Sequence, residues 1–332
     1  MDLNEHFKEK FENKMNRRQF LIRAGKAGGL IAVSSALGLF LYDSKGPTGE
    51  EKSDLFQLSD YSIPELGKKM AIVKGEDRKA TVTKAIDALG GMEKFITKGD
   101  KVLLKVNAAF ASPAILSATT NPDLIAKVIE LCLKAGASEV RVTDNPINDP
   151  ESCFKLTGIA DAVKSAGGKL ILPKESYFKP ISVEGGQLIR NWPFLYKPLV
   201  DVDKVIGIAP VKDHQRSGAS MCMKNWYGLL GGRRNTFHQD IHNIIKELAM
   251  MIKPTLVILD GTTTMMTNGP TGGAVSDLKN TNTMIVSTDQ VAADAFGCTL
   301  LGKTVGDLPY ITKAAALKLG TSDYQSLKPI MI

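Results

Sequence analysis

The sequence has little of several features that mark whole classes of protein. It contains only four cysteines and 6% aromatic residues among its 332 residues, and it has a single long apolar stretch. These counts exclude a disulfide-rich scaffold and a membrane protein with several spans. A hydrophobic content of 43% excludes a disordered chain. At roughly 150 residues per domain, the length predicts about two domains.

The chain also has no basic cluster interleaved with aromatic residues. The formal net charge is +7, but residues 1–26 alone carry seven basic and four acidic side chains. The remainder has 35 basic side chains against 31 acidic ones, which is ordinary for a globular domain. A nucleic-acid-binding protein concentrates positive charge on one face. We therefore expect no nucleic-acid partner.

Several catalytic and cofactor motifs are absent. The sequence has no Gly-x-Ser-x-Gly elbow, which argues against a serine hydrolase, and no Gly-Lys-Ser/Thr follows the glycine-rich segment 228–232, so that segment is not a P-loop. The cysteines form no Cys-x-x-Cys pair, so we expect no intrinsic iron–sulfur cluster. Their spacing does not assign disulfides. These cysteines are Cys132, Cys153, Cys222 and Cys298.

The N-terminus carries a targeting pattern. Asn16-Arg17-Arg18-Gln19-Phe20-Leu21 precedes an apolar run from Ala27 to Tyr42 and resembles a twin-arginine export signal. It departs from that signal in having Asn16 where Ser or Thr is usual and Ile22 where Lys is common. We predict that residues 1–45 are a signal or an N-terminal anchor read by the twin-arginine translocation machinery. The mature protein is then periplasmic or otherwise extracytoplasmic.

The apolar run leaves two outcomes open. Its 16 residues, 27–42, fall just short of the roughly 17–25 that span a bilayer. A cleaved signal and an uncleaved segment that tethers the protein to the membrane are both compatible with it. No cysteine lies nearby, which excludes a lipoprotein.

Strand-like and helix-like segments alternate after a polar linker at residues 46–68. Apolar runs predict strands at 70–74, 101–106, 140–143, 205–209, 256–259 and 284–287, and 3.6-residue periodicity predicts helices between them. This alternation predicts an α/β fold with mainly parallel sheet flanked by helices, and a ligand cleft at the carboxyl ends of the strands. We place a first α/β half at 69–190 and a second at 191–332. One continuous sheet crossing residue 190 is the alternative.

Ordered pieces of the sequence resemble the family catalogued as domain of unknown function 362. They include Gly99–Asn107, Thr119–Pro122 and Gly136–Val140 in the first half. The second half adds Lys212-Asp213-His214, Lys224-Asn225 with Gly228, His238, Asp260-Gly261, Gly269-Pro270 with Gly272, and Asp289 with Asp294. The resemblance covers roughly residues 70–320 and implies little about activity. Many members carry a ferredoxin-type cysteine run that this chain lacks, so a redox association would place the electron carrier on a partner subunit.

Two histidines suggest a metal site. His238 and His242 are four residues apart and would share a face if both lie on one helix. Such a pair is a usual half of a divalent-metal site, with His214 and Asp260 as candidates to complete it. The alternative is an ordinary amphipathic helix start whose histidines lie near its polar side.

The segment before that helix suggests an anion site. Gly228-Leu229-Leu230-Gly231-Gly232 is followed by Arg233 and Arg234, whose guanidinium groups can bind carboxylate or phosphate. Further candidates to bind a ligand lie at strand ends or in nearby loops: Lys105, Asn107, Lys212, Lys224, Asn225 and Gly269. A flexible surface loop is the alternative for the glycine-rich segment, and a simple turn is the alternative around Gly269.

Together these patterns predict an exported enzyme or redox-linked accessory protein that binds an anionic small ligand. His214 or His238 would act as a general acid or base, and Asp260 would orient a histidine or bind metal. The alternative is a non-catalytic binding or assembly subunit of an exported redox complex. The catalytic hypothesis requires His214, His238 and Asp260 to lie within about 4–6 Å of a common point.

Overall fold

The computed structural model describes residues 17–40 and 56–332, in two units that divide after Glu51. In the first unit, α2 (Arg17–Phe40) is a helix that begins with the paired arginines, both exposed. Asn16 and the end of the predicted apolar run, Leu41 and Tyr42, lie outside the described residues. Within the described ranges, no helix combines the length and apolar character needed to cross a membrane. Export remains a prediction.

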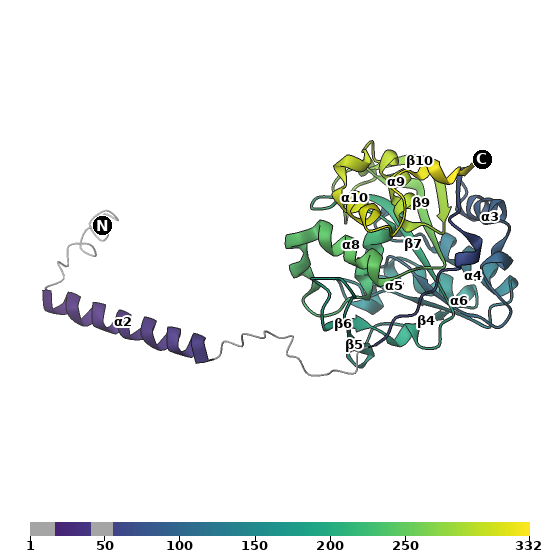
Figure 1. The fold of residues 1–332 in the computed structure, drawn as a ribbon. Helices are drawn as coiled ribbons and strands as arrows, with labels where there is room; N and C mark the ends of the chain where they lie inside the picture. The colour runs from purple at the N-terminus through teal and green to yellow at the C-terminus, as the bar shows by residue number, and fades with distance from the viewer. Residues whose placement is uncertain (1–16, 41–55) are drawn as a thin grey trace, which may run out of the picture. The chain divides into compact units, whose positions relative to one another are not determined.

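The second unit is built on one large mixed sheet (Figure 1). Its strand order is β11-β1-β10-β9-β7-β2-β3-β4, with β8 paired to β7. The parallel pairs are β2/β3, β2/β7, β3/β4, β7/β9 and β1/β11, and the antiparallel pairs are β1/β10, β9/β10 and β7/β8. The strands are β1 (Met70–Lys74), β2 (Lys101–Lys105), β3 (Glu139–Thr143), β4 (Lys169–Leu170), β7 (Lys204–His214), β8 (Gly218–Ser220), β9 (Leu256–Met265), β10 (Leu278–Ser287) and β11 (Ile330–Met331).

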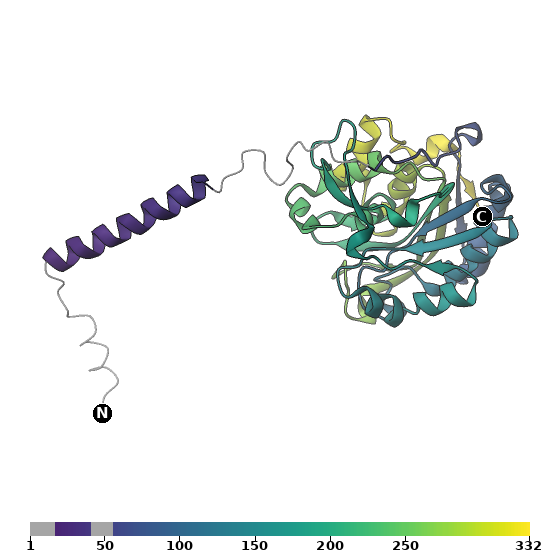
Figure 2. The same cartoon turned by 90° about the horizontal axis from the view of Figure 1, so that it is seen from below.

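Helices cover both faces of this sheet (Figures 1 and 2). Side chains alternate along each strand, so Val257 and Leu259 of β9 enter one core while Leu256 and Ile258 enter the other. The first core contains residues of α7 (Cys222–Asn225), α8 (Ile241–Met251), α9 (Gln290–Leu300) and α10 (Pro309–Ala316). The second contains residues of α3 (Arg78–Ala88), α4 (Pro122–Lys134), α5 (Pro150–Leu156) and α6 (Ile159–Ser165). The predicted α/β class is therefore confirmed.

The sheet corrects the predicted division at residue 190. The first-half strand β2 lies between β3 and the second-half strand β7, and β1 pairs with β10. Residues 52–332 accordingly form one compact unit. The region around residue 190 instead holds a separate two-stranded hairpin, β5 (Phe178–Ile181) and β6 (Trp192–Leu195), in which Pro180 pairs with Pro193.

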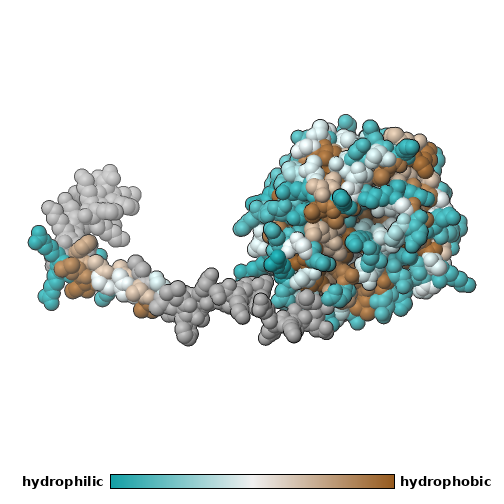
Figure 3. Space-filling model, viewed as in Figure 1, coloured by the Kyte–Doolittle hydropathy of each residue, from teal (hydrophilic) through white to brown (hydrophobic). Residues whose placement is uncertain are grey.

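The predicted linker is also shorter than expected. Residues 46–55 lie outside the described part, but from Phe56 onward the chain packs on the domain. Phe56 stacks on Phe194 with ring centroids 6.1 Å apart, and Tyr61 is buried. These apolar contacts place residues 56–68 in the folded unit, although their polar and glycine-rich neighbours suggested a linker. Figure 3 shows that the visible face of this unit is mainly hydrophilic, as expected when the apolar side chains fill the two cores.

Candidate functional site

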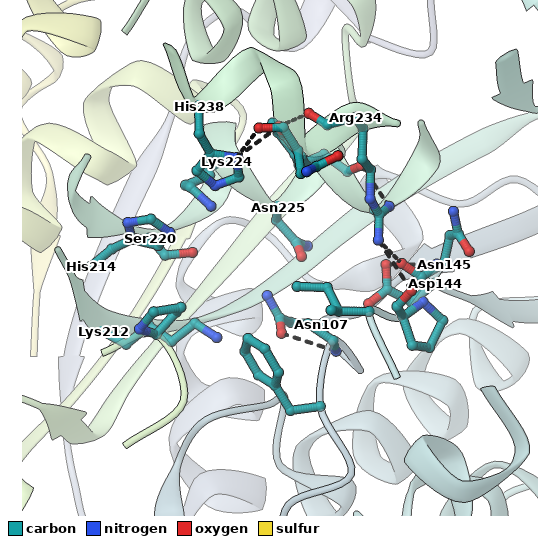
Figure 4. Close-up of a pocket in the computed structure, with 18 of the residues that line it drawn as sticks. Asn107, Asp144, Asn145, Lys212, His214, Ser220, Lys224, Asn225, Arg234 and His238 are labelled. Atoms are coloured by element: carbon teal, nitrogen blue, oxygen red, sulfur yellow. Dashed lines mark hydrogen bonds between the residues drawn. The ribbon is translucent and has the colours of Figure 1, made fainter. Parts of the chain in front are cut away.

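A cleft of about 650 Å³ lies where β2, β3 and β7 end and the chain turns into α7 (Figure 4). Among the described residues that line it, four carry cationic side chains and one carries a carboxylate. These are Lys105, Lys212, Lys224, Arg234 and Asp144. The neutral lining includes Asn107, Phe110, Asn145, His214, Ser220, Asn225, Tyr227, Gly228, His238 and Pro270. The cleft therefore has a surplus of positive charge that suits an anion.

A buried ion pair forms the floor of the cleft. Lys105 ends β2, Asp144 follows β3, and the two strands are parallel neighbours, so Nζ lies 2.8 Å from Oδ1. Lys105 also donates to the carbonyl oxygens of Val106 at 2.6 Å and Asn225 at 2.7 Å. Gly228 lies against the pair, since a Cβ there would come within 1.8 Å of the carboxylate. Lys105 is thus fully engaged by the protein, which makes it structural.

Lys212 and Lys224 are the lysines that face the cleft without a carboxylate partner. Lys212 donates to the carbonyl of Ala118, and its Nζ lies 5.1 Å from the centre of the Phe110 ring. The side chain of Lys224 makes no hydrogen bond or ion pair with the described residues, and its Nζ lies 5.2 Å from the centre of the Tyr227 ring. Burial, with smaller contributions from neighbouring cations, lowers the pKa of each lysine to about 7. An anion between them would reverse part of this shift.

The two histidines of the site stack on each other and differ in tautomer. Their ring centroids are 5.8 Å apart at 16°. Nδ1 of His214 accepts from the backbone N–H groups of Arg216 and Ser217 at 3.2 and 3.3 Å, which leaves the proton on Nε2. Nδ1 of His238 lies 3.2 Å from the carbonyl oxygen of Asn235, which can only accept, so here Nδ1 carries the proton and Nε2 the lone pair.

Electrostatics keep both rings neutral. Burial and then the Lys224 charge lower the pKa of His214 to about 2. The same two causes, in the same order, lower the pKa of His238. The stack therefore presents one imidazole N–H that can donate a hydrogen bond and one imidazole lone pair that can accept a proton.

The paired arginines have different positions. Arg234 lines the cleft, but its guanidinium donates to the carbonyl oxygens of Tyr227, Leu230 and Asn145 at 2.6–3.0 Å. It fastens the loop after β3 to the glycine-rich segment. Arg233 is exposed and is not among the lining residues. The predicted bidentate pair is therefore one structural cation and one surface residue.

The predicted metal ligands do not come together. α8 begins at Ile241, so His238 lies in the preceding 3-10 helix (Arg234–Asp240) and does not share an α-helical face with His242. His242 instead stacks on Tyr310, with centroids 6.2 Å apart. Over residues 17–40 and 56–332, no three His, Cys, Asp or Glu side chains are grouped as metal ligands. The i, i+4 argument failed because the helix starts three residues after His238.

Asp260 is also outside the cleft lining. It alternates with Val257 and Leu259 on β9 and so faces the α3 side of the sheet, where its carboxylate pairs with Arg78 at 2.7 Å. It therefore does not meet the two histidines at the cleft. β9 continues to Met265, so Asp260 is inside the strand and not at its end, as the sequence suggested.

The remaining predicted residues are divided between lining and support. Asn225 is buried and donates to the carbonyl oxygens of Lys105 and Ile208, which ties β2 to β7. Asn107 lines the cleft. Gly269 is buried against the backbone of Asp213, while its neighbour Pro270 lines the cleft. Gly269 acts by allowing that close approach, since a Cβ would lie 1.9 Å from the Asp213 carbonyl oxygen.

Ser220 and Tyr227 are among the lining residues that the sequence analysis did not identify. Ser220 enters the cleft because β8 folds back on β7 and pairs it with Lys212. A three-residue strand gives no periodicity signal. The hydroxyl of Tyr227 donates to the carbonyl oxygen of Arg234, and its ring lies beneath Lys224. The sequence signal that could have identified Tyr227 is its position between Asn225 and Gly228, which were both predicted to belong to the site.

The comparisons with known proteins agree on family. Residues 102–299 match the family described as a domain of unknown function, DUF362, and this stretch contains every lining residue of the cleft. The chain belongs to the DUF362 family. A thylakoid-associated protein of Synechocystis sp. is 28% identical over 254 residues, covering 73% of this chain and 74% of that protein.

Among solved structures, this DUF362 chain is similar to a lactate racemase apoprotein from Thermoanaerobacterium thermosaccharolyticum, with 13% identity and a TM-score of 0.37. It covers 74% of this chain and 58% of that one. A protein from Thermotoga maritima gives 12% identity and a TM-score of 0.36, covering 68% of this chain and 59% of the other. The chain thus spans less than two thirds of the length of either structure.

Proposed function

We propose that the cleft binds a small anionic molecule, with Lys212 and Lys224 as the binding cations. The observation that carries this is Lys224, a half-buried lysine that faces the cleft and has no anionic partner among the described residues. Burying an unpaired ammonium is unfavourable unless a counter-ion joins it. Asp144, the carboxylate of the lining, already pairs with Lys105. The counter-ion therefore comes from a ligand.

The stacked histidines make the protein an enzyme that uses general-base catalysis on that anion. The Nε2 lone pair of His238 can accept a proton while the Nε2–H of His214 donates a hydrogen bond, on a ligand held beside both by the lysines. The second candidate is a binding or assembly subunit without turnover. It is favoured by the position of Asp260 outside the cleft, since the predicted catalytic group required Asp260 beside both histidines. The engagement of Lys105 and Arg234 in structural contacts also leaves fewer groups for chemistry.

Calorimetry with inorganic phosphate, acetate and oxalate tests binding. A bound anion raises the lysine pKa values from about 7, so binding takes up protons near pH 7. The measured heat will then change with the ionisation enthalpy of the buffer. Lys224→Met should weaken binding at least tenfold, about 1.4 kcal/mol. The matched control, Arg233→Met, should not change it. Equal affinities for the two variants would refute the site.

The predictions on targeting and cofactors complete the proposal. We propose that Arg17 and Arg18 direct export by the twin-arginine route and that a redox subunit is a candidate partner. Cell fractionation of Arg17→Lys/Arg18→Lys tests the first: the variant should stay in the cytoplasm, whereas unchanged export would refute it. Metal analysis of purified protein tests the divalent metal: stoichiometric metal lost in His238→Ala would support it, and metal-free protein would refute it.

A further inference from the structure

We propose that Lys224 is a nucleophile that forms an imine with the carbonyl carbon of an anionic aldehyde or ketone, such as a 2-oxo acid. The inference rests on the proposed anion site and names the class of substrate that the site would take. It adds a covalent step that simple anion binding does not require.

The position of Lys224 differs from that of the other cleft lysines. Lys105 donates to Asp144, Val106 and Asn225, so its nitrogen has no lone pair available for attack. Lys212 is 1% exposed and donates to the carbonyl of Ala118. Lys224 is partly exposed to the cleft, and its Nζ lies over the Tyr227 ring, 5.2 Å from the centroid. Figure 4 shows it projecting from α7 toward the histidines.

The surroundings of Lys224 favour the neutral amine. Burial and the nearby Arg234 lower its pKa to about 7, so a large fraction of the amine carries a free lone pair at neutral pH. An exposed lysine with a pKa near 10.4 is almost fully protonated there. Desolvation next to another cation is an established way to activate a lysine toward carbonyl compounds. The geometry therefore supplies both a reachable amine and the charge state that it needs.

The neighbouring groups can carry the protons of this step. Lys224 is close enough to His214 and His238 that its charge lowers the pKa of both. The Nζ lone pair attacks the carbonyl carbon while the Nε2–H of His214 donates a hydrogen bond to the carbonyl oxygen. Nε2 of His238 takes one proton from the nitrogen and passes it to that oxygen, which gives a hydroxyl. The second proton of the nitrogen follows by the same route, so the hydroxyl leaves as water, the C=N bond forms, and both histidines end neutral without an oxidant. Lys212 would hold the carboxylate.

Reductive trapping on the full chain tests the inference. The protein is incubated at pH 7 with glyoxylate or pyruvate and sodium cyanoborohydride, and modified lysines are identified by peptide mass spectrometry. Exposed Lys279 serves as the internal reference. We expect Lys224 to be modified at least tenfold faster than Lys279. Dihydroxyacetone phosphate in place of the 2-oxo acids shows whether the anionic group is a carboxylate or a phosphate.

Variants locate the adduct and separate this inference from the anion site. Lys224→Arg should abolish the fast modification by the carbonyl compound, whereas Lys212→Arg should still give an adduct on Lys224. Thermal melting establishes that both variants are folded. Reductive trapping in the wild-type chain tests the imine independently of whether the two variants fold. Glycolate, which has no carbonyl group to attack, reports anion binding alone. If glycolate binds but Lys224 is modified no faster than Lys279, the imine is refuted and the anion site stands. If nothing binds or is trapped, both fail.

Discussion

Replacing Asp144 with Asn tests the ion pair that forms the floor of the cleft. The change removes one charge with almost no change of volume and leaves the Lys105 ammonium buried, where both side chains are at most 2% exposed. Removing one partner of a buried ion pair costs about 3–5 kcal/mol, because the remaining charge is uncompensated. We therefore expect Asp144→Asn to lower the free energy of unfolding by about 3–5 kcal/mol at pH 7.

The loss should become smaller as the pH rises. Burial already lowers the pKa of Lys105 in the wild-type chain, and the Asp144 carboxylate opposes this shift. Without the carboxylate the folded-state pKa falls further, while the unfolded value stays near 10.4. Between these two values the unfolded chain binds more protons, so stability increases with pH. The variant should recover part of its deficit by about pH 10.

Urea unfolding from pH 7 to pH 10, followed by the fluorescence of the buried Trp226, measures both effects. Lys105→Met and the double variant Lys105→Met/Asp144→Asn complete a double-mutant cycle. We expect the double variant to be more stable than Asp144→Asn alone, because it carries no unpaired charge. A deficit below about 1 kcal/mol that is independent of pH would refute this account of the pair.

Two further substitutions test contacts that hold the site and its surroundings. Gly228→Ala places a Cβ 1.8 Å from the Asp144 carboxylate and should lower the free energy of unfolding by about 3 kcal/mol, whereas Gly273→Ala, with open space around it, should change it by less than about 0.5 kcal/mol. Urea unfolding compares them, and equal values would contradict the close approach. Glu247→Ala leaves the N–H groups of residues 187–189 without their carboxylate acceptor and should cost about 3 kcal/mol. Glu184→Ala, at an exposed position nearby, is its control, and a comparable loss there would refute a special role for Glu247.

Local patterns were sufficient for most of the regular elements. The strand at 70–74 has the predicted bounds, and the helix Pro122–Lys134 lies between the strands predicted at 101–106 and 140–143, because apolar periodicity is a property of neighbouring residues. The strands beginning near residues 204, 256 and 278 are longer than predicted. Their extensions are polar or irregular, and only pairing with neighbouring strands makes them extended.

The candidate site shows the same division. The sequence by itself determined the family, the α/β class and the presence of lysines and histidines around a glycine-rich segment, since each of these depends on residue types in order. Only the tertiary structure decided that Arg234 and not Arg233 reaches the cleft, that Asp260 faces Arg78, and that His238 stacks on His214. The reason is physical. The face of the sheet to which Asp260 points depends on how the side chains alternate along its strand. The direction of the His238 side chain depends on the residue at which the next helix starts. The contacts of both side chains depend on elements that are distant in the chain.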